Sequence, residues 1–337
     1  MPRSAARSAA RQRAAPPNER DKPRAFHHSR FPAAEIARAR RGQTVSVCLP
    51  ARECAATVGQ IVATLQQLRG EGVLDEIVVV DAGSVDGTAA VAERAGAIVW
   101  QEEQLMPAFG PVLGKGDAMW RALPFLSGEL VCFLDADTER FPAHFATGLL
   151  GALVCEPGVV FAKGFYRRSL SQGGLSLPDA GGRVNHLTAR PALELLYPEL
   201  AAVRQPLAGE VAARRTLLEE VPFSSGYGVE IAMLIDVWRR VGVRGMAQVD
   251  LDEHRNRSQP LPALHSMAVT VLATALARAR RDGRYGDAQA PAARNGAAAS
   301  TAPGGPPPQI SAPVERPALS SLFADRSLER VRAPGRA

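Results

Sequence analysis

Short apolar runs that alternate with helical patterns between residues 44 and 134 constrain the fold of this chain most. Four of these runs have the length of a buried strand: Val45–Leu49, Ile77–Val80, Ala97–Trp100 and Leu130–Leu134. Between them, apolar residues recur at helical spacing over 58–68, and helices are expected over 88–95 and 116–125. This alternation predicts an α/β fold with a doubly wound, Rossmann-like, mostly parallel sheet and helices on both faces.

The second half of the folded region is less regular. We expect helices over Val211–Glu219 and Val229–Val241, and a short strand over Met246–Leu251 ahead of His254. The Gly- and Ser-rich stretch Ser169–Arg183 is expected to be a mobile loop.

The two ends of the chain differ from its middle in composition. Residues 1–41 hold 11 Lys and Arg against 3 Asp and Glu, so they carry the basic charge of a chain whose net charge is +6. Residues 1–43 are therefore expected to be a disordered basic leader, with a targeting role left open. Residues 283–337 are rich in Ala, Pro, Gly and Arg and are expected to be a disordered tail.

Membrane and disulfide signals are weak in this sequence. No apolar run approaches the roughly 20 residues that span a bilayer, so no membrane span is expected. The four cysteines show no C-x-x-C spacing, and two of them, Cys48 and Cys132, lie inside predicted strands. A reducing, cytoplasmic location is the expectation, and no nucleic-acid partner is indicated for the folded part.

The tripeptide Asp135-Ala136-Asp137 carries the clearest chemical signal. It follows a predicted buried strand, at the edge where α/β sheets bind their ligands. Carboxylate oxygens there suit Mg²⁺ or Mn²⁺, and such an ion can hold a nucleotide diphosphate. Two aspartates in a turn are the alternative.

Two further turns should open on the same edge of the sheet. One holds Pro50, Ala51 and Glu53, and the other begins with Asp81 and Ala82. Converging carboxylates suit the ribose or base of a nucleotide, while caps for the turn and the next helix are an equally valid role.

Two basic residues lie in flexible turns. Lys115 stands between two glycines, but the turn lacks the other residues of a P-loop, so we expect a lone lysine that can neutralise a diphosphate. Arg183 follows Gly181 and Gly182 and can bind phosphate or carboxylate through paired donors. Solvated surface charges are the alternative for both.

His254 is the one histidine near these motifs with a chemical interpretation. It can be a third metal ligand through its neutral imidazole, or a structural histidine.

The order of these motifs resembles the glucosyl-3-phosphoglycerate synthase family from about residue 44 to 275. The early motifs are shared by many family 2-like glycosyltransferases, and those from Phe165 onward are more specific. The motifs are Pro50-Ala51, Val80–Asp86, Gly114-Lys115-Gly116, Asp135-Ala136-Asp137, Phe165–Arg168, Gly181–Val184, Gln205–Glu210, Gly226–Glu230 and His254–Arg257.

The resemblance implies a GT-A fold and a retaining transfer of glucose from UDP-glucose to the 2-hydroxyl of 3-phosphoglycerate. It also implies a homodimer and dependence on Mg²⁺, with Mn²⁺ as a possible replacement. Residues 44–165 would be the nucleotide-sugar-binding half, and residues 166–282 a smaller acceptor-binding half with the C-terminal helices.

The resemblance also implies residue roles. Asp137 and His254 would bind the metal, and the catalytic residues would be Asp135, Lys115 and Glu230. Donor-binding residues would be Pro50, Ala51, Glu53, Asp81, Ala82, Lys115, Asp135 and Ala136. Acceptor-binding residues would be Gly182, Arg183, Asn185 and Asn256.

This chain departs from the family pattern around the nucleoside. Cys54 replaces a glutamate that the resemblance places against the nucleoside, and Ala82 replaces a serine. These changes leave open a different nucleotide sugar or acceptor, or a non-catalytic protein that binds nucleotide. The strand-end carboxylates and the basic loop would also suit a nucleotidyltransferase.

Overall fold

The computed structural model describes residues 22–168, 170–172, 175–177, 181–254, 261–285 and 314–324. Its centre is an eight-stranded sheet built from β1 (Arg24–His27), β2 (Val45–Ala51), β3 (Glu76–Asp81), β4 (Ile98–Gln101), β5 (Leu130–Phe133), β6 (Phe161–Arg167), β9 (Val211–Arg214) and β11 (Met246–Glu253). The strand order is β1-β11-β6-β9-β5-β2-β3-β4, and β9 alone runs antiparallel to its neighbours. The prediction of a mostly parallel sheet is confirmed.

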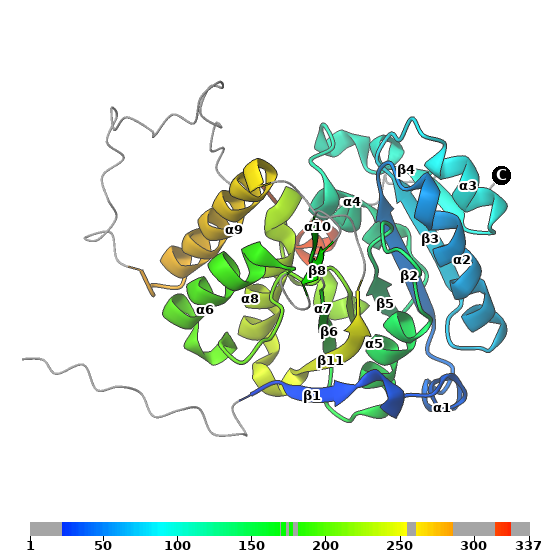
Figure 1. Ribbon diagram of the computed structural model, residues 1–337, viewed down its shortest axis with the longest axis horizontal. Helices are drawn as coiled ribbons and strands as arrows, with labels where there is room; N and C mark the ends of the chain where they lie inside the picture. Colours follow the sequence, from blue (N-terminus) through cyan, green and yellow to red (C-terminus); the bar gives the residue numbers. More distant parts are fainter. Residues whose placement is uncertain are drawn as a thin grey trace, which may run out of the picture.

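Helices cover both faces of this sheet, as the sequence predicted (Figure 1). One apolar core lies under α1 (Ala33–Ala39), α2 (Ala55–Gly70), α3 (Thr88–Arg94) and α5 (His144–Cys155). The other lies under α4 (Lys115–Ala122), α6 (Arg190–Leu196), α7 (Arg215–Glu219), α8 (Val229–Val241) and α9 (Leu261–Arg281). Strands such as β3, whose residues are all buried, read as continuous apolar runs because both of their faces are covered.

The prediction of a disordered leader over residues 1–43 is wrong for the part of it that the structure describes. β1 pairs in parallel with β11, and α1 packs against α5. Phe31 and Ile36 are fully buried in the core. The average composition of the segment concealed these apolar residues, and their partners lie more than 100 residues away in the sequence.

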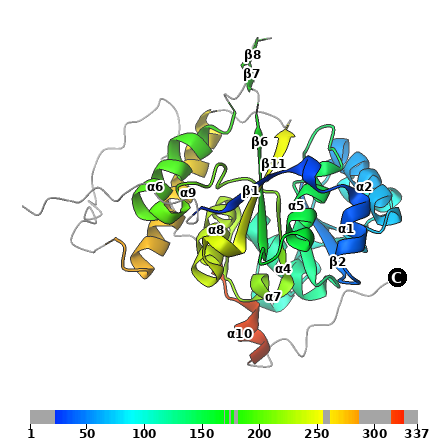
Figure 2. The ribbon, with the colours of Figure 1, turned by 90° about the horizontal axis from the view of Figure 1, so that it is seen from below.

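The helix expected over Val211–Glu219 is also wrong in its first half. Residues 211–214 form β9, which fills the gap between β5 and β6, and the helix α7 begins at Arg215. Hydrogen bonds to two neighbouring strands outweigh the helical preference of the alanines here. The expected loop over Ser169–Arg183 contains a hairpin of β7 (Leu170–Gln172) and β8 (Leu175–Leu177), which projects from the body in Figure 2.

Part of the expected C-terminal tail is ordered as well. β12 (Glu315–Arg316) pairs with β10 (Phe223–Ser224), and α10 (Leu319–Ala324) follows it. Arg316 reaches the buried Asp117 at the start of α4, with a distance of 2.6 Å from Nε to Oδ1. The composition of residues 283–337 predicted disorder, but this buried ion pair fixes one short stretch of them.

By length and composition alone, α9 could cross a membrane, which the sequence analysis did not expect. The mean hydropathy of an 18-residue window in it is 1.3. A single helix of this kind is weak support for a membrane span, because core helices of soluble proteins have the same composition. In this fold α9 packs against α6 and α8, and its Arg278 is buried beside Asp236.

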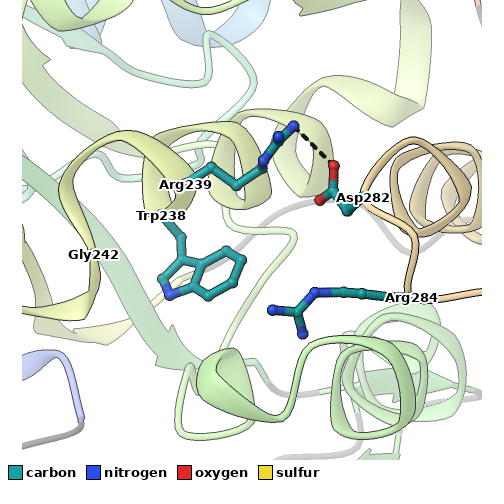
Figure 3. Close-up of a pocket in the computed structure, with 5 residues that line it drawn as sticks. All are labelled: Trp238, Arg239, Gly242, Asp282 and Arg284. Atoms are coloured by element: carbon teal, nitrogen blue, oxygen red, sulfur yellow. Dashed lines mark ion pairs between the residues drawn. The ribbon is translucent and has the colours of Figure 1, made fainter.

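A shallow hollow lies between α8 and the end of α9 (Figure 3). Its charges already have partners within the protein. Arg239 pairs with Asp282 at 2.8 Å, and the Arg284 guanidinium stacks on the Trp238 ring with 4.9 Å to the ring centroid. This hollow is therefore no candidate for a catalytic site.

Candidate active site

Three parallel strands, β2, β3 and β5, end at the same edge of the sheet and place the predicted carboxylates there. Ala51 is in register with Asp81, and the Ala82 N–H donates to the Ala51 carbonyl. Asp135 and Asp137 follow the end of β5, which pairs with β2. The structure therefore brings together the strand-end residues that the sequence predicted.

A lysine joins two carboxylates from distant parts of the chain. Lys115, the first residue of α4, donates to Asp135 Oδ1 at 2.5 Å and to Glu230 Oε1 at 2.9 Å. Burial opposes the charge of the ammonium group, but Asp135 and Glu230 raise the pKa of Lys115 well above its ordinary value. The ammonium group stays charged, and it holds Asp135 and Glu230 together.

Gly209 leaves the space that this ion pair occupies. A Cβ atom on Gly209 would lie 2.3 Å from Asp135 Oδ1 and 2.6 Å from Lys115 Nζ. Both distances are far shorter than a van der Waals contact. Only glycine at this position lets Asp135 and Lys115 lie against the backbone between Ala208 and Glu210.

Asp137 stands beside this group and remains exposed to solvent. The protein around its carboxyl displaces water and raises the pKa of Asp137, and the neighbouring Asp135 carboxylate adds to this rise. Lys115 and His254 act in the opposite direction. Two adjacent carboxylates, one of which resists ionisation, favour the binding of a cation between them.

His254 is buried on the far side of the site, immediately after β11. Its Nε2 atom lies 3.1 Å from Thr138 Oγ1 and 3.3 Å from Glu210 Oε1, and its ring stacks on Tyr166 with centroids 4.5 Å apart. Although burial opposes ionisation, the adjacent His254 lowers the pKa of Glu210 to about 2. Glu210 is therefore a carboxylate that orients the imidazole.

The other nitrogen of this ring provides a test of metal binding. His254 Nδ1 is buried and has no hydrogen-bond partner among the described residues. A metal-binding histidine commonly donates its second nitrogen to a carboxylate, as His254 can do to Glu210. Together with the Asp137 carboxylate, this unpartnered nitrogen suits a divalent cation.

Sequence reasoning missed two buried charges of the site, Glu210 and Lys163. Lys163 lies on β6 and donates to the Ala208 carbonyl at 2.6 Å. Burial lowers the pKa of Lys163 to about 8, against the opposing effect of the nearby Glu230 and Glu210 carboxylates. A lysine inside the apolar stretch Phe161–Phe165 is the signal that would have found it.

The predicted donor-binding residues Asp81 and Glu53, in the turns after β3 and β2, bond to the backbone of the turn after β3. The Asp81 carboxylate accepts from the Ser84 N–H at 3.3 Å, and Glu53 Oε1 accepts from the Val85 N–H at 2.9 Å. The Cys54 thiol donates to the Arg52 carbonyl, and burial raises the pKa of Cys54 to about 11, so it stays protonated. One carboxylate oxygen of Glu53, the residue beside Cys54, is thus engaged with the neighbouring turn.

The predicted acceptor loop lies beside the end of β6. Gly182 has a φ of 69°, and the preceding Gly181 N–H donates to the Arg168 carbonyl. The Asn185 side chain bonds to the backbone of Arg204 and Leu207, so it braces two segments. Arg183 is half-buried at the start of this segment, and Asn256 falls outside the described residues.

Comparison with known proteins agrees with this geometry. The glycosyl transferase family 2 profile matches residues 46–175. The glucosyl-3-phosphoglycerate synthase of Mycolicibacterium smegmatis is 45% identical over 245 residues, which are 73% of this chain and 80% of that protein. The enzyme of the same name from Petrotoga mobilis is 38% identical over 266 residues, 77% of this chain and 82% of that protein.

The chain belongs to the glucosyl-3-phosphoglycerate synthase family. Solved structures show that it is a GT-A glycosyltransferase, as the motif order predicted. A Mycobacterium tuberculosis member bound to Mn²⁺, UDP-glucose and phosphoglyceric acid has a TM-score of 0.70 and 40% identity, covering 77% of this chain and 88% of that one. The structure of a mannosyl-3-phosphoglycerate synthase from Rubrobacter xylanophilus has a TM-score of 0.73 and 45% identity. The match covers 78% of this chain and 83% of that one.

Proposed function

We propose that this glycosyltransferase moves glucose from UDP-glucose to the 2-hydroxyl of 3-phosphoglycerate, with retention and with Mg²⁺ or Mn²⁺ as cofactor. The observation that carries the proposal is the Lys115 bridge between Asp135 and Glu230, directly beside Asp137 and His254. Relatives of the same family are named for this product, and their structures hold these substrates and ions.

Asp137 and the unpartnered Nδ1 of His254 would hold the divalent ion. When bound, the ion supplies a Lewis acid that neutralises charge on the departing nucleoside diphosphate. Glu210, 3.3 Å from Nε2, would orient His254, and Nδ1 would be the nitrogen left to bind the ion. A bound cation would favour the ionised form of Asp137 and offset the repulsion from Asp135.

Lys115 would supply a second positive charge for the diphosphate. Its ammonium group is positioned by Asp135 and Glu230 before the substrate arrives, so little reorganisation accompanies the reaction. Glu230 is engaged with Lys115, which makes it a poor nucleophile toward the sugar. We therefore infer attack from the face on which the diphosphate leaves, with the departing phosphate taking the acceptor proton.

Arg183 would hold the phosphate of the acceptor. A guanidinium group binds a phosphate through two parallel hydrogen bonds, which fixes orientation as well as position. Gly182 allows the turn before it, and Asn185 braces the segment after it, so that the loop presents Arg183 in a defined place. Orientation of the acceptor hydroxyl lowers the entropic cost of attack.

We further propose a cytoplasmic homodimer in which residues 44–165 bind the donor and residues 166–282 bind the acceptor. All four cysteines are free thiols, in agreement with a reducing compartment. Exposed leucines on η6 (Asn185–Ala189), α6 and α9 form an apolar surface for the second copy: Leu187, Leu195, Leu261 and Leu272. Light scattering should give a molecular mass in solution of twice one chain. Leu195→Glu should lower that mass toward the mass of one chain.

A second candidate is the same reaction with another donor sugar. The nucleoside side of the site departs from the family pattern at Cys54 and Ala82, and Glu53 bonds to Val85. A mannosyl-3-phosphoglycerate synthase is also among the similar structures. The two candidates differ in the donor that supports turnover.

The test is to mix the protein with Mg²⁺, 3-phosphoglycerate and, separately, UDP-glucose, GDP-glucose, ADP-glucose and GDP-mannose. Acceptor-dependent release of UDP, which Asp137→Ala abolishes and the exposed control Glu71→Ala preserves, supports the proposal. Turnover with GDP-mannose alone supports the second candidate. Pyrophosphate release would contradict both and indicate a nucleotidyltransferase, and calorimetric binding without turnover would indicate a non-catalytic protein.

A further inference from the structure

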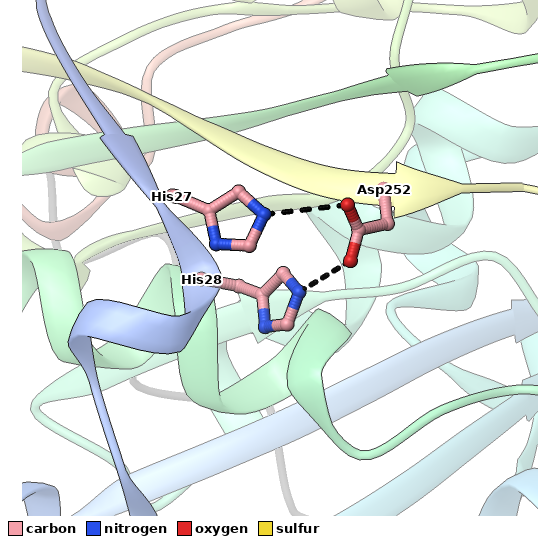
Figure 4. Close-up of side chains that lie close together, drawn as sticks. All are labelled: His27, His28 and Asp252. Atoms are coloured by element: carbon pink, nitrogen blue, oxygen red, sulfur yellow. Dashed lines mark hydrogen bonds and ion pairs between the residues drawn. The ribbon is translucent and has the colours of Figure 1, made fainter.

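Two histidines and an aspartate meet where β1 and β11 end (Figure 4). His27 Nε2 lies 3.3 Å from Asp252 Oδ1, and His28 Nε2 lies 2.7 Å from Asp252 Oδ2. The three groups offer ligand atoms that all lie within 4.8 Å of one another. None of them belongs to the active site described above.

The backbone is shaped to bring these side chains together. Consecutive side chains of a strand point to opposite faces, so the two rings share one carboxylate only because the chain turns at His28 into the short helix η2 (His28–Arg30). On the other side, β11 has an irregularity between Asp250 and Glu253, and Asp252 has a φ of 63°. That left-handed conformation is uncommon for a residue other than glycine.

Neighbouring groups orient both rings. Ser29 flanks the His27 ring: its N–H donates to His27 Nδ1 at 3.3 Å, and its Oγ lies 2.8 Å from the same nitrogen, so Nδ1 is held toward Ser29 while Nε2 faces Asp252. The His28 ring stacks on His144 with centroids 3.8 Å apart. The nearest cation is Arg167, 3.9 Å from Asp252, and it is largely exposed and free to turn away.

We propose that His27, His28 and Asp252 form a second metal site, which takes a zinc-like divalent transition metal. Two imidazole nitrogens with one carboxylate are a typical zinc ligand set, whereas Mg²⁺ takes mostly oxygen ligands. Bonds of about 2.0–2.2 Å would place the ligand atoms about 3–3.5 Å apart, close to the 3.3 Å and 2.7 Å that now separate the two imidazoles from the Asp252 oxygens. Coordination through Nε2 requires the proton of each neutral imidazole to be on Nδ1, and Ser29 Oγ can accept that proton from His27.

Such an ion would cross-link β1 to β11, the strand that ends at Glu253, just before His254. The site is half-exposed, so water would complete the coordination, and the role is structural. The bound ion would stabilise the pairing of an edge strand with the sheet, without entering the glycosyl transfer.

Calorimetric titration of metal-stripped, full-length protein with Zn²⁺, in saturating Mg²⁺, tests the proposal. We expect one equivalent of Zn²⁺ to bind in the wild type and in Asp137→Ala, which lacks a ligand of the proposed catalytic site. His28→Ala and Asp252→Asn should weaken this binding about tenfold or more. His265→Ala removes an exposed histidine elsewhere and should bind as the wild type does.

Thermal unfolding separates binding from misfolding. Zn²⁺ should raise the Tm of the wild type and of His265→Ala, but not that of His28→Ala, whose Mg²⁺-dependent turnover should be unchanged. Zn²⁺ uptake that survives both His28→Ala and Asp252→Asn, uptake that is lost in Asp137→Ala, or no uptake at all would each overturn the proposal.

Discussion

Replacing Gly209 with alanine adds one methyl group at the point where Asp135 and Lys115 meet the backbone. The new Cβ would lie 2.3 Å from Asp135 Oδ1, whereas ordinary contacts begin at 3.4 Å. The carboxylate must therefore retreat by about 1 Å, and a displacement of that size costs on the order of 10²-fold in rate. This loss corresponds to about 2.7 kcal/mol in the activation free energy. Gly209 has no left-handed φ, so backbone strain contributes nothing.

The assay is kcat/KM from acceptor-dependent release of nucleoside diphosphate, with Tm measured on the same samples. Because Asp135 and Lys115 are partly exposed and can move, Gly209→Ala should lose activity while its Tm changes little. Gly70→Ala is the matched control, since a Cβ there meets nothing within 4 Å. A Gly209→Ala protein with the kcat/KM of the wild type would refute the assignment of this ion pair to the catalytic site.

Three further predictions concern buried charges. Arg316→Ala leaves Asp117 without one of its buried partners and should lower the free energy of unfolding by about 3 kcal/mol, whereas the exposed Arg240→Ala should cost less than about 1 kcal/mol in the same denaturant titration. Lys115→Ala should lower kcat by about 10²–10³-fold in steady-state assays, because the leaving group loses its preorganised cation. Glu210 has a pKa below its ordinary 4.5, so it contributes stability above that pH and loses it as the pH falls toward about 2. Between pH 4.5 and about 2, the free energy of unfolding should therefore fall less steeply with pH in Glu210→Gln than in the wild type. Equal slopes in the two proteins would contradict the depressed pKa of Glu210.

Local patterns predicted the parts of the site that depend on neighbours in the sequence. Asp135 and Asp137 were found because they follow a buried strand, and parallel strands end at one edge. The bridge from Lys115 to Glu230 joins residues 115 positions apart, and no spacing rule reports such a pair. The space left by Gly209 likewise appears only when the backbone is in place.

The same reason explains the errors in the fold. β1 exists because β11, more than 200 residues later, offers it a strand to pair with. β9 has four residues, and its two alanines favour a helix over a strand. The segment is nevertheless a strand because β5 and β6 lie on either side of it. The ordered stretch 314–324 depends on the Arg316–Asp117 pair, which joins residues 199 positions apart.

The most direct test of the central claim is the anomeric proton signal of the product. The protein is incubated with Mg²⁺, UDP-glucose and 3-phosphoglycerate, and the reaction is followed by proton NMR. UDP-glucose is an α-glucoside, so a retaining transfer predicts a new α-anomeric signal whose growth matches the release of UDP and stops when Asp137 is replaced by alanine. A β-anomeric product, or UDP release that does not require the acceptor, would contradict the account.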